Sequence, residues 1–208
     1  MKDLISQGKA LYWATSAWPS LRIMEAIHIC DKIGAPRPIA DQCIYNMLKR
    51  DEIEKEYPIL FDDYDYGSTT WSPLEYGILT GKYNNGIPEG SRFDKMGAQF
   101  KGTMELYFGE GKKEKTLEML NKLSEIAKRH DASMTQLALA WVLGSNDVST
   151  VIFGSSKLSQ LEENMKAVEL KNKLTKETWD EIEEALGNRP EPSSTYRTGF
   201  GKKQAPRR

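Results

Sequence analysis

Four segments of the sequence combine polar, aromatic and glycine side chains in a way that suits ligand binding. Each one overlaps or follows a short β-branched or aromatic run of the kind that forms strands. In parallel α/β architectures, ligands bind to the loops that leave the carboxyl ends of such strands. The four segments are Thr15-Ser16-Ala17-Trp18, the stretch from Gln42 to Asn46, Trp71-Ser72-Pro73-Leu74 and Gly154-Ser155-Ser156-Lys157.

The last of these segments has the composition of a phosphate-binding site. It places a glycine, two hydroxyls and a lysine just before a predicted helix, where free backbone N–H groups attract anions. The alternative is that Ser156 only caps the helix. The segment taken alone favours neither interpretation.

Two single side chains suit other parts of a ligand. The flat indole of Trp71 could stack on a cofactor ring, and the side-chain amide of Gln42 could pair with a carboxamide. Each residue type, taken alone, is more often found in a core or a cap. Physical reasoning on the residues therefore predicts a parallel α/β domain with a possible anionic-ligand site.

The sequence offers no evident catalytic or metal-binding set. His28 and His130 lie in predicted helices without metal-ligand spacing, which favours surface or core histidines. Cys30 and Cys43 lack CxxC spacing, so we expect reduced thiols. No GxGxxG, GxxxxGK[ST] or GxSxG motif is present, which argues against Rossmann, P-loop and α/β-hydrolase sites.

The elements that must position these segments alternate between strands and helices, which is typical of βαβ units and a parallel sheet. We expect strands at 10–15, 38–45, 67–71 and 148–153. A helix is predicted over 19–30, closed by Gly34, and another over 51–61, where Pro58 limits the regularity of its end.

The second half of the chain is predicted to be mainly helical. Residues 82–111 are rich in Gly, Asn, Pro and Ser without a steady period, so we expect a long functional loop. A helix with an apolar face over 117–127 then ends near His130, and Ser133 and Gln136 form a capping box for a helix over 137–143. Two further helices fit 158–167 and 175–186, the second between Thr175 and Gly187.

Charge and hydropathy exclude several classes of partner. The 29 basic and 30 acidic residues give a net charge of -1, which argues against binding to nucleic acid or to a membrane surface. The N-terminus has no apolar signal region, and the run at 137–143 is too short to cross a bilayer. We therefore expect a cytoplasmic protein without membrane insertion.

Seven strings resemble the aldo-keto reductase family and occur in that family's order, most similar to its branch of voltage-gated potassium channel β-subunits. The resemblance runs from about Gly8 to Arg197. The strings are LYWATSAW at 11–18, DQCIYNM at 41–47, TWSPL at 70–74, GILTGKY at 77–83, QLALAW at 136–141, VIFGSS at 151–156 and QLEEN at 160–164.

This resemblance implies a (β/α)₈ TIM barrel that binds NADPH across the carboxyl ends of its strands and reduces a small carbonyl compound. The chain is similar to the C-terminal half of that barrel, strands 5–8, over residues 1–188. A basic tail with prolines and serines, which we expect to be disordered, follows at 189–208.

The resemblance also implies which residues hold the nicotinamide and pyrophosphate parts of NADPH. Ser16 and Gln42 would bind the nicotinamide carboxamide, and Trp71 would flank its ring. The pyrophosphate would lie along Ser72, Pro73 and Leu74. Lys82 and Arg92 of the long loop would close over it.

The adenosine end is implied in the same way. Gly154 and Ser156 would meet the adenosine phosphate, and Gln160, Glu163 and Asn164 would surround the ribose and adenine. Three positions depart from the family pattern. Ala17 stands where an arginine is common, and Glu75 and Tyr76 replace small residues; the acid would oppose pyrophosphate binding unless it turns away.

The family's catalytic residues have no counterpart in this chain. In the family a tyrosine acts as general acid and is tuned by lysine, aspartate and histidine, all on the first four strands. We therefore expect a truncated product or gene model, or a chain that completes its sheet with a partner, because exposed sheet edges are normally avoided.

Three functional hypotheses follow from the resemblance. The first is the NADPH-binding half of a carbonyl reductase, not catalytic as this chain alone. The second is a nucleotide-binding regulatory subunit associated with a channel or with further copies of itself. The third is a fragment without function.

Overall fold

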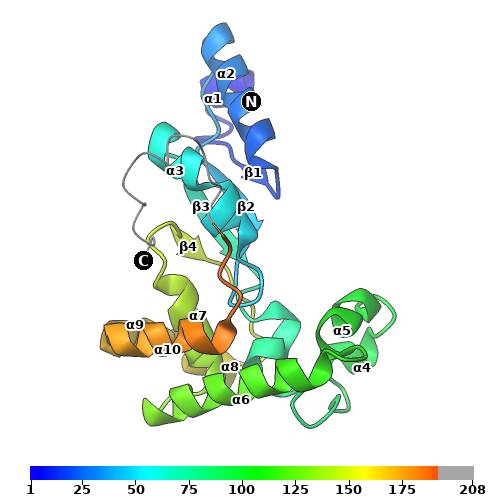
Figure 1. Cartoon of the computed structure of the whole chain (residues 1–208). Coiled ribbons are helices and arrows are strands. Elements are labelled where there is room, and N and C mark those ends of the chain that lie inside the picture. Colours follow the sequence, from blue (N-terminus) through cyan, green and yellow to red (C-terminus); the bar gives the residue numbers. More distant parts are fainter. Residues whose placement is uncertain (192–208) are drawn as a thin grey trace.

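The computed structural model describes residues 1–191 and contains one four-stranded parallel sheet with the order β1-β2-β3-β4 (Figure 1). Its register pairs Ser16 with Gln42 and Ile44 with Trp71. The α/β class and the parallel sheet expected from the sequence are confirmed. The strands are β1 (Thr15–Ser16), β2 (Ala40–Ile44), β3 (Gly67–Trp71) and β4 (Thr150–Val151), so the first and last are shorter than the runs at 10–15 and 148–153.

One helix precedes β1, and helical segments follow each strand. In the first part of the chain these are α1 (Lys2–Ser6), α2 (Ser20–Ile33), the π-helix η1 (Glu52–Glu56) and α3 (Pro58–Tyr64). After β3 come the 3₁₀ segment η2 (Glu75–Thr80), α4 (Arg92–Lys95), α5 (Lys101–Phe108), α6 (Lys113–Arg129) and α7 (Met134–Leu143). The last three are α8 (Leu158–Met165), α9 (Ala167–Lys173) and α10 (Lys176–Leu186).

Local capping signals predicted several helix ends correctly. α2 ends at Gly34 in the left-handed conformation, with φ of 59°. Ser133 and Gln136 form the expected reciprocal capping box at the start of α7. Thr175 accepts a hydrogen bond from the backbone N–H of Thr178, and Gly187 ends α10. These features depend on neighbouring residues, which is why the sequence alone reveals them.

Two predicted helices are each divided in the structure. The pattern over 51–61 becomes η1 and then α3, because Pro58 cannot continue a helical hydrogen-bond ladder and instead begins α3. The pattern over 158–167 ends at Met165, and α9, which we did not predict, begins at Ala167. α1 and η2 were also missed.

The prediction of an irregular loop over 82–111 is wrong, because it contains α4 and α5. Ser91 caps α4 by accepting a bond from the backbone N–H of Asp94. Aromatic rings hold the segment together: Tyr83 stacks on Phe93 with centroids 4.4 Å apart, and Phe93 lies 5.7 Å from Phe100. Phe93 and Phe100 are seven residues apart, which is a helical spacing, but the glycines of the segment favoured the prediction of a loop.

The core lies on one face of the sheet. Asp41, Cys43, Ser68 and Thr70 point into it, and apolar side chains of α2, α3, α6 and α7 complete it. The opposite face carries Ser16, Gln42 and Trp71, which are exposed or half-buried. Figure 1 shows the sheet between α1 and α2 at one end and α6 to α10 at the other, with α4 and α5 to one side.

Two further expectations concern the ends and the hydropathy of the chain. Of the predicted tail at 189–208, residues 192–208 lie outside the described residues. Within residues 1–191, no helix combines the length and the apolar character needed to cross a bilayer.

Candidate functional site

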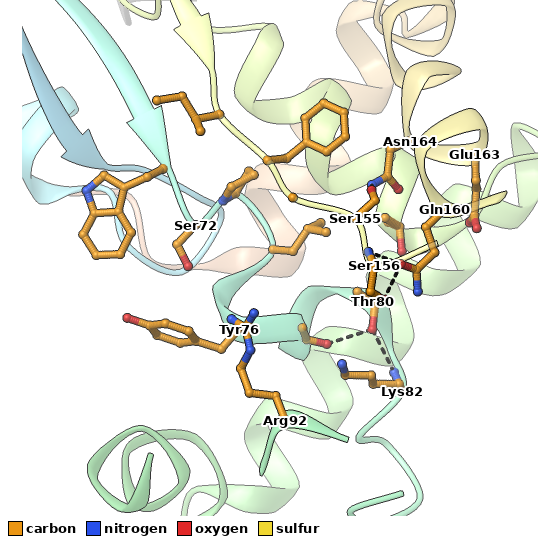
Figure 2. A pocket seen from close by; sticks show the side chains of 18 residues that line it. Ser72, Tyr76, Thr80, Lys82, Arg92, Ser155, Ser156, Gln160, Glu163 and Asn164 are labelled. Atoms are coloured by element: carbon orange, nitrogen blue, oxygen red, sulfur yellow. Dashed lines mark hydrogen bonds between the residues drawn. The ribbon is translucent and has the colours of Figure 1, made fainter. Parts of the chain in front are cut away.

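A cavity of about 690 Å³ opens beside the carboxyl ends of β3 and β4 (Figure 2). Its size is that of an ordinary small-molecule site. Eleven of the thirteen residues that the resemblance implied for NADPH line it, although they are scattered over more than ninety positions. They are Trp71, Ser72, Pro73, Leu74, Lys82, Arg92, Gly154, Ser156, Gln160, Glu163 and Asn164.

The other two, Ser16 and Gln42, lie outside the cavity lining. They are paired neighbours in the sheet, and the Ser16 hydroxyl donates to the Gln42 carbonyl oxygen at 3.4 Å. Their side chains share the open face of the sheet with Trp71. The structure therefore sets them beyond Trp71, along the sheet from the cavity.

Asp41 shapes the turn that follows Ser16. This fully buried carboxylate accepts hydrogen bonds from the backbone N–H groups of Ala17 at 2.9 Å and Trp18 at 3.3 Å. Ala17 has a φ of 54°, a left-handed conformation that costs energy for a non-glycine residue. Sequence reasoning missed this role of Asp41, because its partners are on another strand.

The loop before α8 tests the interpretation of Ser156 as a helix cap. Lys157, not Ser156, is the N-cap residue of α8, and no side chain caps the helix. Ser156 instead donates from both its hydroxyl and its backbone N–H to Oε1 of Gln160, at 3.1 and 3.0 Å. The capping interpretation is wrong, and the start of α8 faces the cavity without a side-chain cap (Figure 2).

Two cations face the cavity from the segment after η2. Within residues 1–191, neither Lys82 nor Arg92 forms an ion pair with an acidic side chain. The Lys82 side chain runs across Gly77, where a Cβ atom would come within 2.6 Å of its Cε. Gly77 has a φ of 98°, a conformation that favours glycine, whereas the flexible end of the Lys82 side chain can move aside for a Cβ atom.

The turn over 72–76 carries unusual backbone strain. Ser72, Glu75 and Tyr76 all have positive φ, at 56°, 42° and 54°. Such conformations cost about 1–3 kcal/mol each and persist where surrounding contacts enforce them. Asn46 supplies one contact, because its Nδ2 donates to the Ser72 carbonyl oxygen at 2.9 Å.

Glu75 does not face the cavity. Its side chain is buried with 1% exposure and accepts bonds from Asn46 Nδ2 at 2.9 Å and the Tyr107 hydroxyl at 3.1 Å. Burial raises the pKa of the Glu75 carboxyl above its ordinary value, while both hydrogen bonds oppose that shift. The acid therefore turns away from the path along which it would have opposed an anionic ligand.

Seven further lining residues were not among the thirteen that the resemblance implied for NADPH. They are Tyr76, Gly77, Thr80, Thr135, Ile152, Phe153 and Ser155. Most fall inside the strings GILTGKY and VIFGSS, so their position in those strings was the available signal. Thr135 is brought to the cavity by the start of α7, and only the packing of that helix reveals it.

Comparison with known proteins shows which family the chain belongs to. Residues 1–186 match the model of the "Aldo/keto reductase family". The chain is 48% identical over 188 residues to a Schizosaccharomyces pombe protein described as "Putative voltage-gated potassium channel subunit beta". That match covers 90% of this chain but 54% of the relative, so the chain spans about half the length of the relative.

Proposed function

Because the chain belongs to the aldo/keto reductase family, we propose that it forms the NADPH-binding part of a reductase for small carbonyl compounds. It would represent strands 5–8 of the family's TIM barrel. The observation that carries the proposal is the cavity itself. Lys82 and Arg92, without acidic partners among the described residues, line it together with Ser156 and Gln160 at the uncapped start of α8.

The described residues fit a dinucleotide phosphate. Positive charge at a helix start and two cations without an acidic partner among the described residues favour an anion, and hydrogen bonds to charged groups contribute about 1.5–3 kcal/mol each. Gly154 has open space around its Cα, so a phosphate can approach the backbone there. Lys82 lines the cavity, and its Nζ lies close to Gly77 and 4.9 Å from the centroid of the Tyr83 ring.

The remaining residues would orient the two ends of the cofactor. Ser156, Gln160, Glu163 and Asn164 offer hydroxyl, amide and carboxylate groups for the adenosine end. Asn164 is buried, and its Nδ2 donates to the Ser155 hydroxyl at 3.3 Å, which holds it in place. NADPH, when bound, supplies a hydride for carbonyl reduction.

The nicotinamide end would lie over the open face of the sheet. Trp71 presents its indole between the cavity and the strands that carry Ser16 and Gln42. An aromatic ring there packs against a flat ring and excludes water from one side of it. The Gln42 amide has both donor and acceptor, as pairing with a carboxamide requires.

We expect NADPH to quench the tryptophan fluorescence of the purified chain, because the indole of Trp71 lines the proposed site. Trp71→Phe should remove most of this quenching. Trp18→Phe is the matched control, because Trp18 is outside the cavity lining and the change should leave the quenching in place. Unchanged fluorescence of the folded protein at millimolar NADPH would reject the proposed site.

We propose further that this chain does not reduce carbonyl compounds by itself. No residue in it matches the family's tyrosine general acid or the lysine, aspartate and histidine that tune it. Loss of a general acid lowers rates by about 10²–10⁴-fold. NADPH oxidation in the presence of small aldehydes should stay at the background rate, and turnover that Trp71→Ala abolishes would overturn this expectation.

The name of the 48% identical relative supports a second candidate function, a nucleotide-binding subunit of a potassium channel. In that case the chain would work in a complex with a channel or with further copies of itself. Purification of the tagged chain from its source membranes separates the candidates. Recovery of a channel protein favours the regulatory subunit, and recovery of the chain alone favours the reductase part.

A further inference from the structure

The turn over 72–76 and the segment 92–108 are joined at two adjacent residues. The Tyr76 ring lies 4.8 Å from the Phe100 ring, and the Glu75 carboxyl accepts the hydrogen bond from Tyr107 of α5. Within residues 1–191, this is the one side-chain hydrogen bond that ties α5 to another element. Figure 1 shows α4 and α5 to one side of the molecule, where few other elements reach them.

On the side of the sheet, the turn over 72–76 is held by the side chain of Asn46. Asn46 is fully buried directly after β2, and its Oδ1 accepts the backbone N–H groups of Leu48 at 2.8 Å and Lys49 at 2.9 Å. Its Nδ2 donates to both the Ser72 carbonyl oxygen and Glu75 Oε2. The Oδ1 atom and both N–H groups of the Asn46 side chain are therefore hydrogen-bonded. Asn46 cannot move without losing several of these bonds.

Glu75 joins these two ends through its own two oxygens. Its exposed fraction of 1% means that water cannot replace either partner. Loss of a hydrogen bond to a buried carboxylate destabilises the folded state, because a polar group is left without a partner. The chain Tyr107–Glu75–Asn46 therefore resists separation at either end, even though none of the three side chains lines the cavity.

We infer that Glu75 is a positioning residue, which rests on the NADPH-binding function proposed above: it couples α5 to the turn over 72–76 and so keeps Arg92 in place over the cofactor cavity. Arg92 begins α4, and its neighbour Phe93 lies 5.7 Å, centroid to centroid, from the ring of Phe100, the residue that immediately precedes α5. Leu74 and Tyr76, on either side of Glu75, line the cavity directly. Movement of α5 would therefore displace both Arg92 and the cavity-lining residues of the turn over 72–76.

Three variants test this coupling. Tyr107→Phe keeps the ring and removes the hydroxyl that donates to Glu75. Glu75→Ala removes both bonds. Glu75→Gln can keep both, because its Oε1 can accept from Asn46 while its Nε2 donates to the Tyr107 hydroxyl, which accepts as well as donates. Tyr12→Phe is the control, since Tyr12 is 70% exposed and away from the site.

We expect NADPH to bind about tenfold more weakly to Tyr107→Phe and Glu75→Ala. Glu75→Gln and Tyr12→Phe should bind within about twofold of the original chain. Without cofactor, trypsin should cleave after Arg92, Lys95 and Lys101 faster in Tyr107→Phe and Glu75→Ala. The double variant Tyr107→Phe/Glu75→Ala should bind no more weakly than Glu75→Ala, because both changes break the same connection.

The outcomes separate the two proposals. If the original chain does not bind NADPH, the proposed function fails, and unchanged tryptic cleavage in the variants would also refute the tether to α5. If the original chain binds NADPH and all variants bind equally well, the function stands and the inference about Glu75 is wrong. Loss of binding in Glu75→Gln as large as in Glu75→Ala would likewise contradict a positioning role through these two bonds.

Discussion

NADPH binding should weaken by about 100-fold when Lys82 and Arg92 are both replaced by alanine, since each charged hydrogen bond contributes about 1.5 kcal/mol or more. Both cations line the cavity and neither has an acidic partner among the described residues. Their charge is therefore available to a phosphate. Titration of the tryptophan fluorescence at constant ionic strength measures the loss, because salt screens such contacts.

A control variant with the same change in net charge is Arg22→Ala/Lys128→Ala. Both residues are exposed, and each pairs with a glutamate of its own helix, Glu25 and Glu125. This control should bind NADPH with nearly unchanged affinity. Equal weakening in both double variants would mean that overall charge, not the cavity, governs binding.

Arg50→Ala should lower the free energy of unfolding by about 3–5 kcal/mol, because removal of one partner leaves buried charges uncompensated. The Arg50 side chain is 1% exposed. Its guanidinium donates to both oxygens of Glu54, at 2.8 and 2.7 Å, and to Glu183 at 2.9 Å. Burial by itself would lower the Arg50 pKa, but the bonds to Glu54 and Glu183 raise it overall.

The same side chain links distant parts of the chain. It donates to Asn188 at 3.1 Å and lies 5.1 Å from the centroid of the Trp141 ring. Arg50 thus connects the loop after β2 with α7 and the end of α10. Its loss should lower the urea midpoint without changing the slope of the unfolding transition, if only stability changes.

Arg129→Ala provides the matched control for this measurement. Arg129 pairs with Glu181, another glutamate of α10, but both side chains are about half exposed. Exposed pairs contribute only about 0–1 kcal/mol. If Arg50→Ala cost no more than Arg129→Ala, the buried arrangement around Arg50 would not stabilise the fold as described.

Short-range patterns explain the successful predictions of the fold. The parallel sheet followed from β-branched runs that alternate with helical ones, and the ends of α2, α7 and α10 followed from capping residues within four positions. Pro58 indicated that the helix would be interrupted near Tyr57, but it did not indicate which helix types would form on either side. The sequence did not predict the π-helix there, which buries Ile53 and is followed by the buried Tyr57.

The segment 82–111 shows where local patterns fail. Its glycines and Pro88 are typical of a loop, yet the rings of Phe93 and Phe100 pack together and Tyr107 belongs to the same buried core. These three residues are seven positions apart, which is a helical spacing, but the glycines among them favoured a loop. Intrinsic preference is a weak guide where tertiary packing supplies most of the stability.

The sequence by itself determined the family strings and the parallel α/β class, and through the resemblance it predicted thirteen residues for one ligand site. Only the tertiary structure decided that eleven of them share a cavity while Ser16 and Gln42 lie beyond Trp71. It also decided that Glu75 turns inward, because Asn46 and Tyr107 offer it hydrogen bonds from positions 29 and 32 residues away. Residue types and spacing specify what a side chain can bind, but its direction depends on partners that folding brings close.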